Sequence, residues 1–351
     1  MPQCLKCGTE LTVNEEGVAP VLCDSCAGVA TKRAHRGLSA AGSMGQFPVT
    51  TALLAINLAV CAGMLVTGGF APFNTLRWGA NYGPLTLGGE YWRLVTAGFI
   101  HGGFLHIAFN MWCLLSLGRL SERLFGRWQT FVIYMLTGVG GSLLSLAYDP
   151  MRSEVGASGA IFGIAGALLA GLKFGDLAVA PGERKAAISS MLFFIVVNFA
   201  LGTGAFGFGA NTDNMCHLGG FVTGLLIGLP LSAFARNHKV LQAGTLLVTI
   251  LALSAAGGAL VKKYGAQGFA TRVVFAIQQK DYPKAIKLLE RYIALNPDDD
   301  RALVLLGEAY QNDQQPDKAV GAYEQALKLN PNIPEAENAL QELRGNNPPQ
   351  K

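Results

Sequence analysis

A serine, two histidines and an asparagine stand near the beginnings of three apolar segments. Ser158 lies in the run Gly156-Ala157-Ser158-Gly159, His217 follows Asn-Met-Cys, and His106 and Asn110 are four residues apart. A serine hydroxyl becomes a nucleophile when an imidazole accepts its proton. This combination of residue types predicts acyl transfer, with Ser158 as the nucleophile and His217 as the base.

The other two side chains would stabilise the negative charge that this attack creates. His106 and Asn110 lie on one face of a helix, and with the backbone N–H of Ser158 they could donate to an oxyanion. No carboxylate is expected at the depth of His217, so the pair is a dyad rather than a triad. Each residue alone could serve packing, but four of them at one depth in three helices favour chemistry.

The elements that must position these residues are membrane helices. A span needs about 20 mainly apolar residues. Seven stretches meet this requirement: 49–68, 104–118, 128–148, 156–175, 187–207, 214–234 and 241–261. The second, fourth and sixth run in the same direction, so the polar residues early in each share the outer half of the membrane. Segment 69–103 is rich in tryptophan and tyrosine and predicts a re-entrant or interfacial structure.

The charge distribution separates a membrane-embedded middle from water-soluble ends. The chain is 51% hydrophobic and 14% charged, against about 25% charged residues in soluble domains. The ends are electrically neutral, which predicts no nucleic-acid partner. Eleven basic residues lie on the side of the N-terminus and six on the other, which predicts a cytoplasmic N-terminus and an extracytoplasmic C-terminal tail in a bacterial cytoplasmic membrane. Lys262 and Lys263 argue weakly against that placement of the tail. The polar opening predicts no signal peptide.

The N-terminal segment has the spacing of a metal site. Two C-x2-C pairs are separated by fifteen residues, and their cysteines are Cys4, Cys7, Cys23 and Cys26. Four thiolates at this spacing fit a structural zinc ribbon. Two disulfides are the alternative, which a reducing cytoplasm disfavours. We therefore expect a zinc-ribbon-like cytoplasmic domain over 1–36 and a linker over 37–47.

The C-terminal segment repeats itself. Residues 285–297 align with 319–331 at an offset of 34, and Leu306, Gly307 and Tyr310 have tetratricopeptide (TPR) spacing. Two repeats and a capping helix over 333–344 predict a TPR domain over 265–351, after a membrane domain over 48–264. Its role would be to bind a protein partner, or else to serve as a passive cap.

Five motifs, in order, resemble those of the rhomboid intramembrane serine proteases. Gly156-Ala157-Ser158-Gly159 resembles the GxSG serine motif, and His217, Gly220 and Gly224 resemble the HxxGxxxG motif. The remaining three resemble the Trp-Arg motif of the first loop, the H-x4-H-x3-N pattern and the GxxxExxxG motif. Their residues are Trp92 and Arg93; His101, His106 and Asn110; and Gly118, Glu122 and Gly126.

The resemblance implies an all-α polytopic membrane protein with a six-helix rhomboid core, here extended by a seventh transmembrane helix. It implies an endopeptidase that cuts transmembrane segments of membrane proteins within the lipid bilayer by a Ser158–His217 dyad, with His106 and Asn110 in the oxyanion hole and no cofactor for catalysis. Phe162 stands where many members have tyrosine, so we expect an altered position of His217 without loss of activity. The alternatives are a catalytically inactive rhomboid-like binder or chaperone and a transporter.

Overall fold

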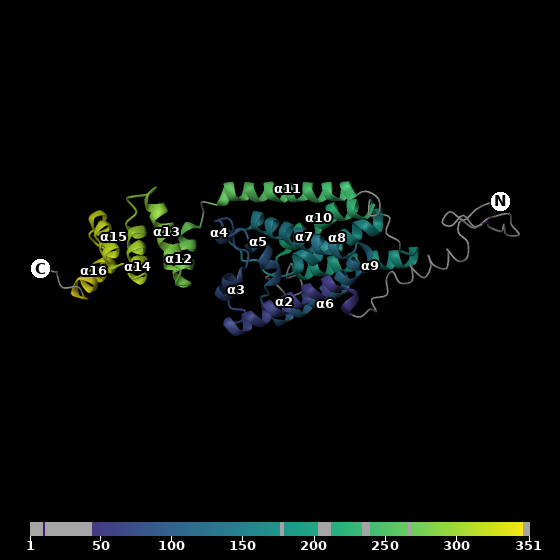
Figure 1. Cartoon of the computed structure of the whole chain (residues 1–351), viewed down its shortest axis with the longest axis horizontal. Helices are drawn as coiled ribbons and strands as arrows, with labels where there is room; N and C mark the ends of the chain where they lie inside the picture. The colour runs from purple at the N-terminus through teal and green to yellow at the C-terminus, as the bar shows by residue number, and fades with distance from the viewer. Residues whose placement is uncertain are drawn as a thin grey trace. The chain divides into compact units, whose positions relative to one another are not determined.

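The computed structural model describes residues 44–175, 179–202, 212–233, 239–265 and 268–346, together with Glu10. The predicted zinc ligands, Cys4, Cys7, Cys23 and Cys26, lie outside these ranges, as do the rest of segment 1–36 apart from Glu10 and residues 37–43 of the predicted linker. Within the described part of the chain the regular elements are helices (Figure 1), with one isolated antiparallel bridge between Asn81 and Glu154.

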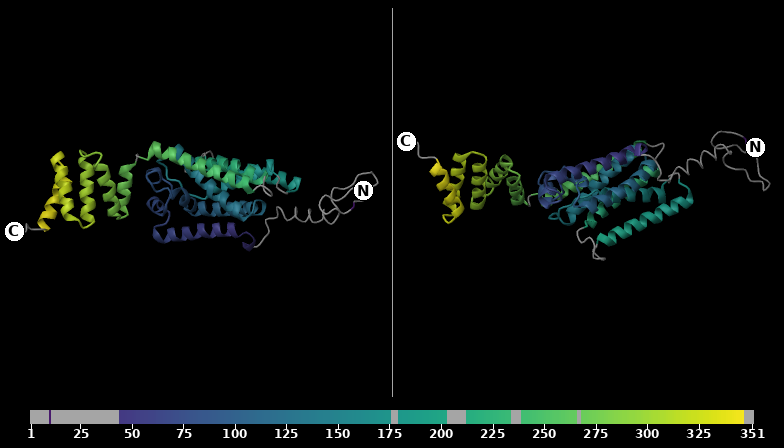
Figure 2. Two further views of the ribbon diagram at one scale, coloured as in Figure 1. Left: turned by 45° about the horizontal axis from the view of Figure 1, so that its top comes forward. Right: turned by 90° about the horizontal axis from the view of Figure 1, so that it is seen from below.

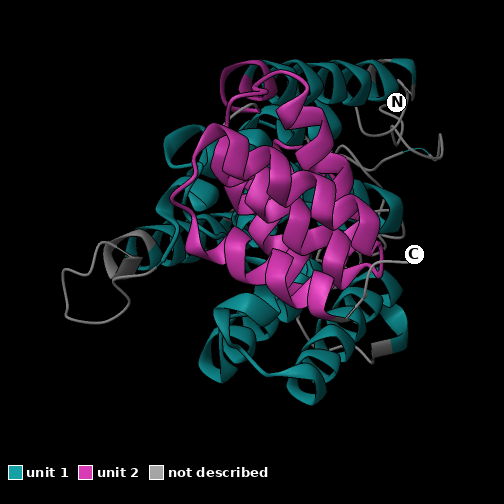
Figure 3. Cartoon of the chain, turned by 90° about the vertical axis from the view of Figure 1, so that its left-hand side faces the viewer, with its two compact units in different colours: residues 1–82, 92–259 teal, residues 83–91, 260–351 magenta. Residues whose placement is uncertain are grey.

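The helices follow one another in the order η1 Met44–Gln46, α2 Pro48–Thr67, α3 Pro72–Trp78, α4 Gly83–Thr86, α5 Arg93–Thr96, η2 Ala97–Phe99, α6 Phe104–Leu124, α7 Arg127–Tyr148, α8 Ser158–Phe174, α9 Pro181–Gly202, α10 Asn214–Ala233, α11 Lys239–Tyr264, α12 Phe269–Gln278, α13 Tyr282–Ile293, α14 Asp300–Asn312, α15 Pro316–Leu329 and α16 Pro334–Asn346. They divide into two compact units, residues 1–82 with 92–259 and residues 83–91 with 260–351 (Figure 3).

A helix is present at each of the seven predicted spans: α2, α6, α7, α8, α9, α10 and α11. Among the described residues, α2, α7, α10 and α11 are long and apolar enough to cross a membrane, and α6 joins them if it forms one broken span with the short helices before it, which are bent from it by 94°. α8 is apolar but has only 17 residues. The chain is therefore a multi-pass membrane protein, and the number seven stays a prediction.

Segment 69–103 folds into short helices and turns around one buried arginine. The Nη1 of Arg93 donates to the carbonyl oxygens of Leu76, at 2.7 Å, and Ala80, at 3.0 Å. Its guanidinium also lies 4.7 Å from the ring of Trp92. Because Arg93 is only 1% exposed, these contacts compensate for the loss of its hydration. The Trp-Arg pair thus holds the loop that precedes α6.

The start of α2 is capped by a carboxylate from α6. Glu122 accepts the backbone N–H of Val49, at 3.2 Å, and that of Thr50, at 2.7 Å. The first N–H groups of a helix have no partner within the helix, so an acidic side chain there satisfies them and complements the helix dipole. A Cβ at Gly118 would stand 2.9 Å from the side chain of Thr50. The spacing of Gly118 and Glu122 therefore serves the packing of α2 on α6.

α8 lies at the centre of the membrane unit, with α7 and α10 packed against it. Most of its residues are buried, including Ile161, Ile164 and Leu168. In contrast, the most apolar stretch of α11 contains no buried residue, and α2 exposes leucine, isoleucine and valine side chains. In a membrane these exposed apolar side chains meet lipid.

Helices α12–α16 form a row of antiparallel neighbours with their own core (Figure 2). The predicted TPR pattern places Leu306, Gly307 and Tyr310 on α14. A Cβ at Gly307 would stand 2.5 Å from the ring of Tyr323 on α15, so the missing side chain lets the two helices approach. The helix expected over 333–344 is α16.

Candidate active site

Three close contacts fix the register between α8 and α10. A Cβ at Gly220 would stand 1.9 Å from the carbonyl oxygen of Gly159, and a Cβ at Gly224 would stand 2.0 Å from that of Gly163. One turn further, a Cβ at Gly228 would stand 2.4 Å from Cα of Ala167. Glycines at this spacing let membrane helices touch backbone to backbone. The first turns of α8 and α10, which contain Ser158 and His217, are therefore side by side.

The imidazole of His217 stacks on the ring of Phe162. The ring centroids are 4.3 Å apart and the planes are inclined by 11°. Phe162 stands one turn after Ser158 and lies on the same face of α8, because residues four apart are neighbours on a helix. Ser158 is partly exposed and His217 is 5% exposed. The stack thus holds the imidazole over the helix face that carries the serine.

Gly156 lies against the imidazole of His106 and close to the hydroxyl of Ser158. A Cβ on Gly156 would stand 2.8 Å from Nε2 of His106 and 3.6 Å from Oγ of Ser158. The φ angle of Gly156 is +127°, a conformation that favours glycine. Its N–H donates to the carbonyl oxygen of Ala97, at 3.0 Å, which joins this turn to η2. A side chain here would press on the imidazole of His106.

On α6, His106 and Asn110 lie one turn apart as predicted. The Nδ1 of His106 accepts the backbone N–H of Gly102 at 3.3 Å, so the neutral ring carries its proton on Nε2. The Nδ2 of Asn110 donates to the carbonyl oxygen of His106 at 2.9 Å, which leaves its second N–H for another acceptor. The ring of His101, fully buried, lies 5.1 Å from the ring of His106.

Two carboxylates lie beside the start of α10, where each accepts a hydrogen bond from Cys216, the residue before His217. Glu154, in the loop before α8, accepts the thiol of Cys216 at 3.4 Å. The Oδ1 of Asp213 accepts the backbone N–H of Cys216 at 2.9 Å. Sequence reasoning missed both because each stands in a loop. A local signal existed for Asp213, an acidic residue just before a helix that can cap its first turn.

The sequence-predicted residues thus fall into three groups. Ser158, His217, Gly156, Phe162 and His106 border one region, with Asn110 and His101 adjacent on α6 and in its preceding loop. Trp92 and Arg93 organise the preceding loop instead. Gly159, Gly220 and Gly224 set the helix register. In the ranges that the structure covers, no group of three or more histidine, cysteine, aspartate or glutamate side chains is placed to hold a metal ion.

Residues 88–234 match the rhomboid domain family, and residues 276–347 match the tetratricopeptide repeat family. RHOMBOID-like protein 1 of Arabidopsis thaliana is 39% identical over 139 residues, 40% of this chain and 34% of the relative. Rhomboid protease GluP of Bacillus subtilis (strain 168) is 35% identical over 209 residues, 58% of this chain and 39% of the relative.

A third relative is matched over most of its own length. Rhomboid protease AarA of Providencia stuartii is 28% identical over 238 residues, which are 60% of this chain and 81% of the relative. The chain spans less than half the length of the Arabidopsis and Bacillus proteins.

Proposed function

Because this chain belongs to the rhomboid family, we propose that it is an intramembrane serine endopeptidase that cuts transmembrane segments of other proteins, with Ser158 as the nucleophile and His217 as the general base. The observation that carries this proposal is the stack of His217 on Phe162 one turn after Ser158. It supports an imidazole held on the face of α8 that presents the hydroxyl.

In the proposed reaction, Oγ of Ser158 attacks the carbonyl carbon of the scissile bond while His217 accepts the hydroxyl proton. The tetrahedral intermediate collapses when His217 gives this proton to the leaving amine, and an acyl-enzyme ester remains on Ser158. A water molecule, deprotonated by His217, then attacks the ester. The second product leaves with a carboxyl end and the serine regains its proton.

The negative charge of the intermediate would lie between α6 and the first turn of α8. The Nε2–H of His106 and the second N–H of Asn110 are the proposed side-chain donors, with the backbone N–H of Ser158 as the third. The closeness of both His106 and Ser158 to Gly156 supports this location for the oxyanion. Loss of one such donor commonly lowers kcat by about 10²–10³-fold.

The substrate must present a backbone carbonyl that an intact helix hides in its own hydrogen bonds. We propose single-pass membrane proteins as substrates, cut at small residues where glycine or proline weakens the helix. The partial exposure of Ser158 supports access from the outer side, and the polar side chains at the start of α6 support the entry of water.

The test is co-expression with an epitope-tagged single-pass substrate, comparing the wild type with Ser158→Ala and His217→Ala. We expect cleavage by the wild type and none by either variant at equal expression. Cleavage that persists in Ser158→Ala would end the protease assignment. Capture of the uncut substrate by the wild type and by Ser158→Ala alike, with no cleavage by either, would favour the inactive binder.

We further propose seven spans in a bacterial cytoplasmic membrane, with domains at 1–36, 48–264 and 265–351 as expected from the sequence. Helices at all seven positions and the basic residues after the second, fourth and sixth support a cytoplasmic N-terminus and an extracytoplasmic TPR domain. Single cysteines introduced at Gly69 and Gly126 test this topology with a membrane-impermeant thiol reagent. Labelling from outside is expected at Gly69→Cys only, and the opposite pattern would reverse the topology.

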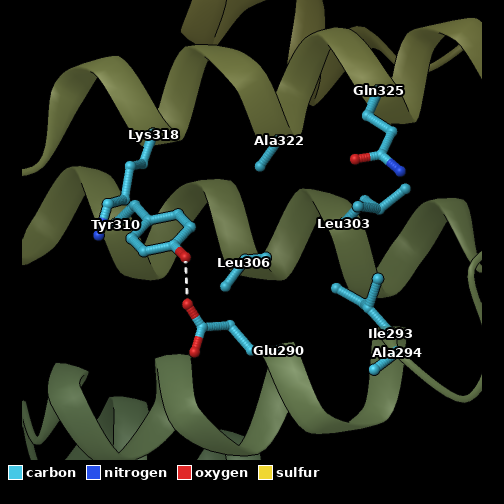
Figure 4. Close-up of a pocket in the computed structure, with 9 residues that line it drawn as sticks. All are labelled: Glu290, Ile293, Ala294, Leu303, Leu306, Tyr310, Lys318, Ala322 and Gln325. Carbon is cyan, nitrogen blue, oxygen red and sulfur yellow. Dashed lines mark hydrogen bonds between the residues drawn. The ribbon is translucent and has the colours of Figure 1, made fainter.

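The TPR domain contains a groove that supports binding of a protein partner. A cavity of about 450 Å³ lies between α13, α14 and α15, with Ile293, Leu303 and Leu306 on its floor (Figure 4). The hydroxyl of Tyr310 donates to Glu290, at 2.5 Å, and burial together with this carboxylate raises the pKa of Tyr310 to about 12. Lys318 stands at the rim. The proposed ligand is a segment with an apolar anchor beside an acidic residue.

Two changes test this role. Deletion of 266–351 should slow cleavage of a native substrate and spare a generic one, and equal effects on both would contradict it. Lys318→Glu should weaken partner binding, whereas Lys328→Glu, an exposed lysine of the same helix outside the groove, should not.

We propose a structural zinc ion at Cys4, Cys7, Cys23 and Cys26, and none for catalysis. Metal analysis of the purified chain should give about one zinc per chain, and Cys4→Ser with Cys23→Ser should remove it without loss of peptidase activity. Two disulfides and no zinc would contradict the site.

A further inference from the structure

Three donors from three separate segments converge on the carboxylate of Glu154. Its Oε2 accepts from Nδ2 of Asn81, at 2.9 Å, and from Oγ of Ser142 on α7, also at 2.9 Å. Its Oε1 accepts the thiol of Cys216 on α10 at 3.4 Å. The backbone of Glu154 also pairs with that of Asn81 in both directions, at 2.8 and 3.0 Å. One side chain therefore connects the first loop, α7 and α10 to the loop that leads into α8.

Burial of this carboxylate is energetically unfavourable for the fold. Glu154 is only 3% exposed, and burial raises its pKa to about 7, although the bonds from Asn81 and Ser142 oppose the shift. A buried carboxyl group destabilises the fold unless its hydrogen bonds compensate. An apolar residue of similar volume would fill the same space without this cost. The position of Glu154, four residues before Ser158, indicates what the carboxylate contributes.

The thiol that Glu154 holds is itself seated between two glycines. A Cβ at Gly159 would stand 2.7 Å from Sγ of Cys216, and a Cβ at Gly141 would stand 2.9 Å from it. The sulfur thus occupies the gap where α7, α8 and α10 meet. Since Cys216 immediately precedes His217, a thiol confined in this gap restrains the backbone that carries the imidazole.

Asp213 also forms hydrogen bonds that hold the first turn of α10. Its Oδ1 accepts the backbone N–H of Cys216, and its Oδ2 accepts the hydroxyl of Ser145 on α7. Asp213 therefore caps α10 and ties the cap to α7. Neither of these bonds reaches the loop before α8. The bond from the thiol of Cys216 to Glu154, in contrast, connects the first turn of α10 to the loop that leads to the serine.

We propose that Glu154 is a positioning residue for His217: through the thiol of Cys216 it holds the first turn of α10 against the loop that leads to Ser158. The inference rests on the proposed function, because it concerns the dyad's geometry. A displacement of about 1 Å between reacting groups can cost on the order of 10²-fold in rate. The effect should therefore fall on kcat, while KM, set by substrate contacts elsewhere, changes little.

The test measures kcat and KM for a fluorogenic transmembrane peptide with the purified full chain. Glu154→Ala should lower kcat about 10- to 100-fold. Glu154→Gln can keep the bonds to Asn81 and Ser142 with its carbonyl oxygen but turns an amide N–H₂ toward the thiol, so it should lower kcat less. Cys216→Ala should act like Glu154→Gln, and Cys216→Ser, which restores a donor, should recover activity. Asp149→Asn, in the same loop but outside this cluster, is the matched control.

The double variant Glu154→Gln with Cys216→Ala shows whether Glu154 and Cys216 affect kcat through one shared contact or independently. If the thiol carries the effect, the double variant should be no slower than the worse single variant. Folded Glu154→Gln and Cys216→Ala with wild-type kcat would overturn the inference, and so would multiplicative losses or an effect on KM alone. If Glu154→Ala does not fold, the kcat values of Glu154→Gln, Cys216→Ala and Cys216→Ser still test the inference. Absence of Ser158-dependent cleavage by the wild type would instead overturn the proposed function.

Discussion

Phe162 and His217 face each other with ring centroids 4.3 Å apart and planes only 11° from parallel. A tyrosine at position 162 would keep this stacking face and add a hydroxyl at its far edge. Phenylalanine at this position, in place of the usual tyrosine, therefore preserves the stacking contact that orients the imidazole.

Removing the ring should misplace the imidazole. Phe162→Ala should lower kcat for a transmembrane peptide about 10- to 100-fold, because the proton acceptor loses the surface that orients it. Phe162→Tyr should stay within a few-fold of the wild type. Stopped-assay kinetics on the purified proteins measure both. Equal kcat for Phe162→Ala and the wild type would show that another contact orients His217.

Side chains added between α8 and α10 should separate the two helices. Gly224→Ala places a Cβ against the carbonyl oxygen of Gly163, which cannot yield as a side-chain end can. Overpacking of this kind typically costs about 1–3 kcal/mol, and the displaced α10 should also slow cleavage. Gly244→Ala on α11 is the control, because nothing lies within 4 Å of its added Cβ. Unfolding in detergent and cleavage rate are the measurements, and equal behaviour of the two variants would contradict the close packing.

Loss of the carboxylate that caps α2 should destabilise the membrane unit without direct effect on the dyad. Glu122→Ala leaves the N–H groups of Val49 and Thr50 without this acceptor. We expect a loss on the order of 1–2 kcal/mol, the cost of a helix cap, with kcat nearly unchanged in the folded fraction. Thermal unfolding and active-site titration check this, and a large fall in kcat at unchanged stability would instead indicate a role near the dyad.

The features that could be predicted from the sequence are those that a single segment of the chain determines. Apolar runs predicted all seven helix positions, and Gly220 and Gly224, four residues apart, have the spacing typical of helices that pack as closely as α10 does on α8. The TPR period likewise predicted the helices of the C-terminal region. Helix periodicity carries such information because one face of each helix must be buried.

Loop residues escaped prediction because their partners are distant in the chain. Glu154 meets Asn81, 73 positions earlier, and Cys216, 62 positions later, and no local pattern encodes those distances. Segment 69–103 was expected to be re-entrant or interfacial, but the position of the break between η2 and α6 was not predicted. The folding of the first loop around Arg93 depends on carbonyl groups that any residue type could supply. Long-range polar contacts of this kind become visible only in three dimensions.

The raised pKa of Glu154 makes stability depend on pH. Its carboxyl group has a pKa of about 7 in the fold and 4.5 as the ordinary value, so the native state binds the proton more tightly than the unfolded chain. This contribution to stability is full below about pH 4.5 and is lost as the pH rises through about 7. The wild type should thus lose stability relative to Glu154→Gln between pH 5 and 8, by on the order of a few kcal/mol. Unfolding temperatures in detergent across this range, with Asp149→Asn as the loop control, measure the difference. A constant gap between the wild type and Glu154→Gln at every pH would show that Glu154 does not titrate there.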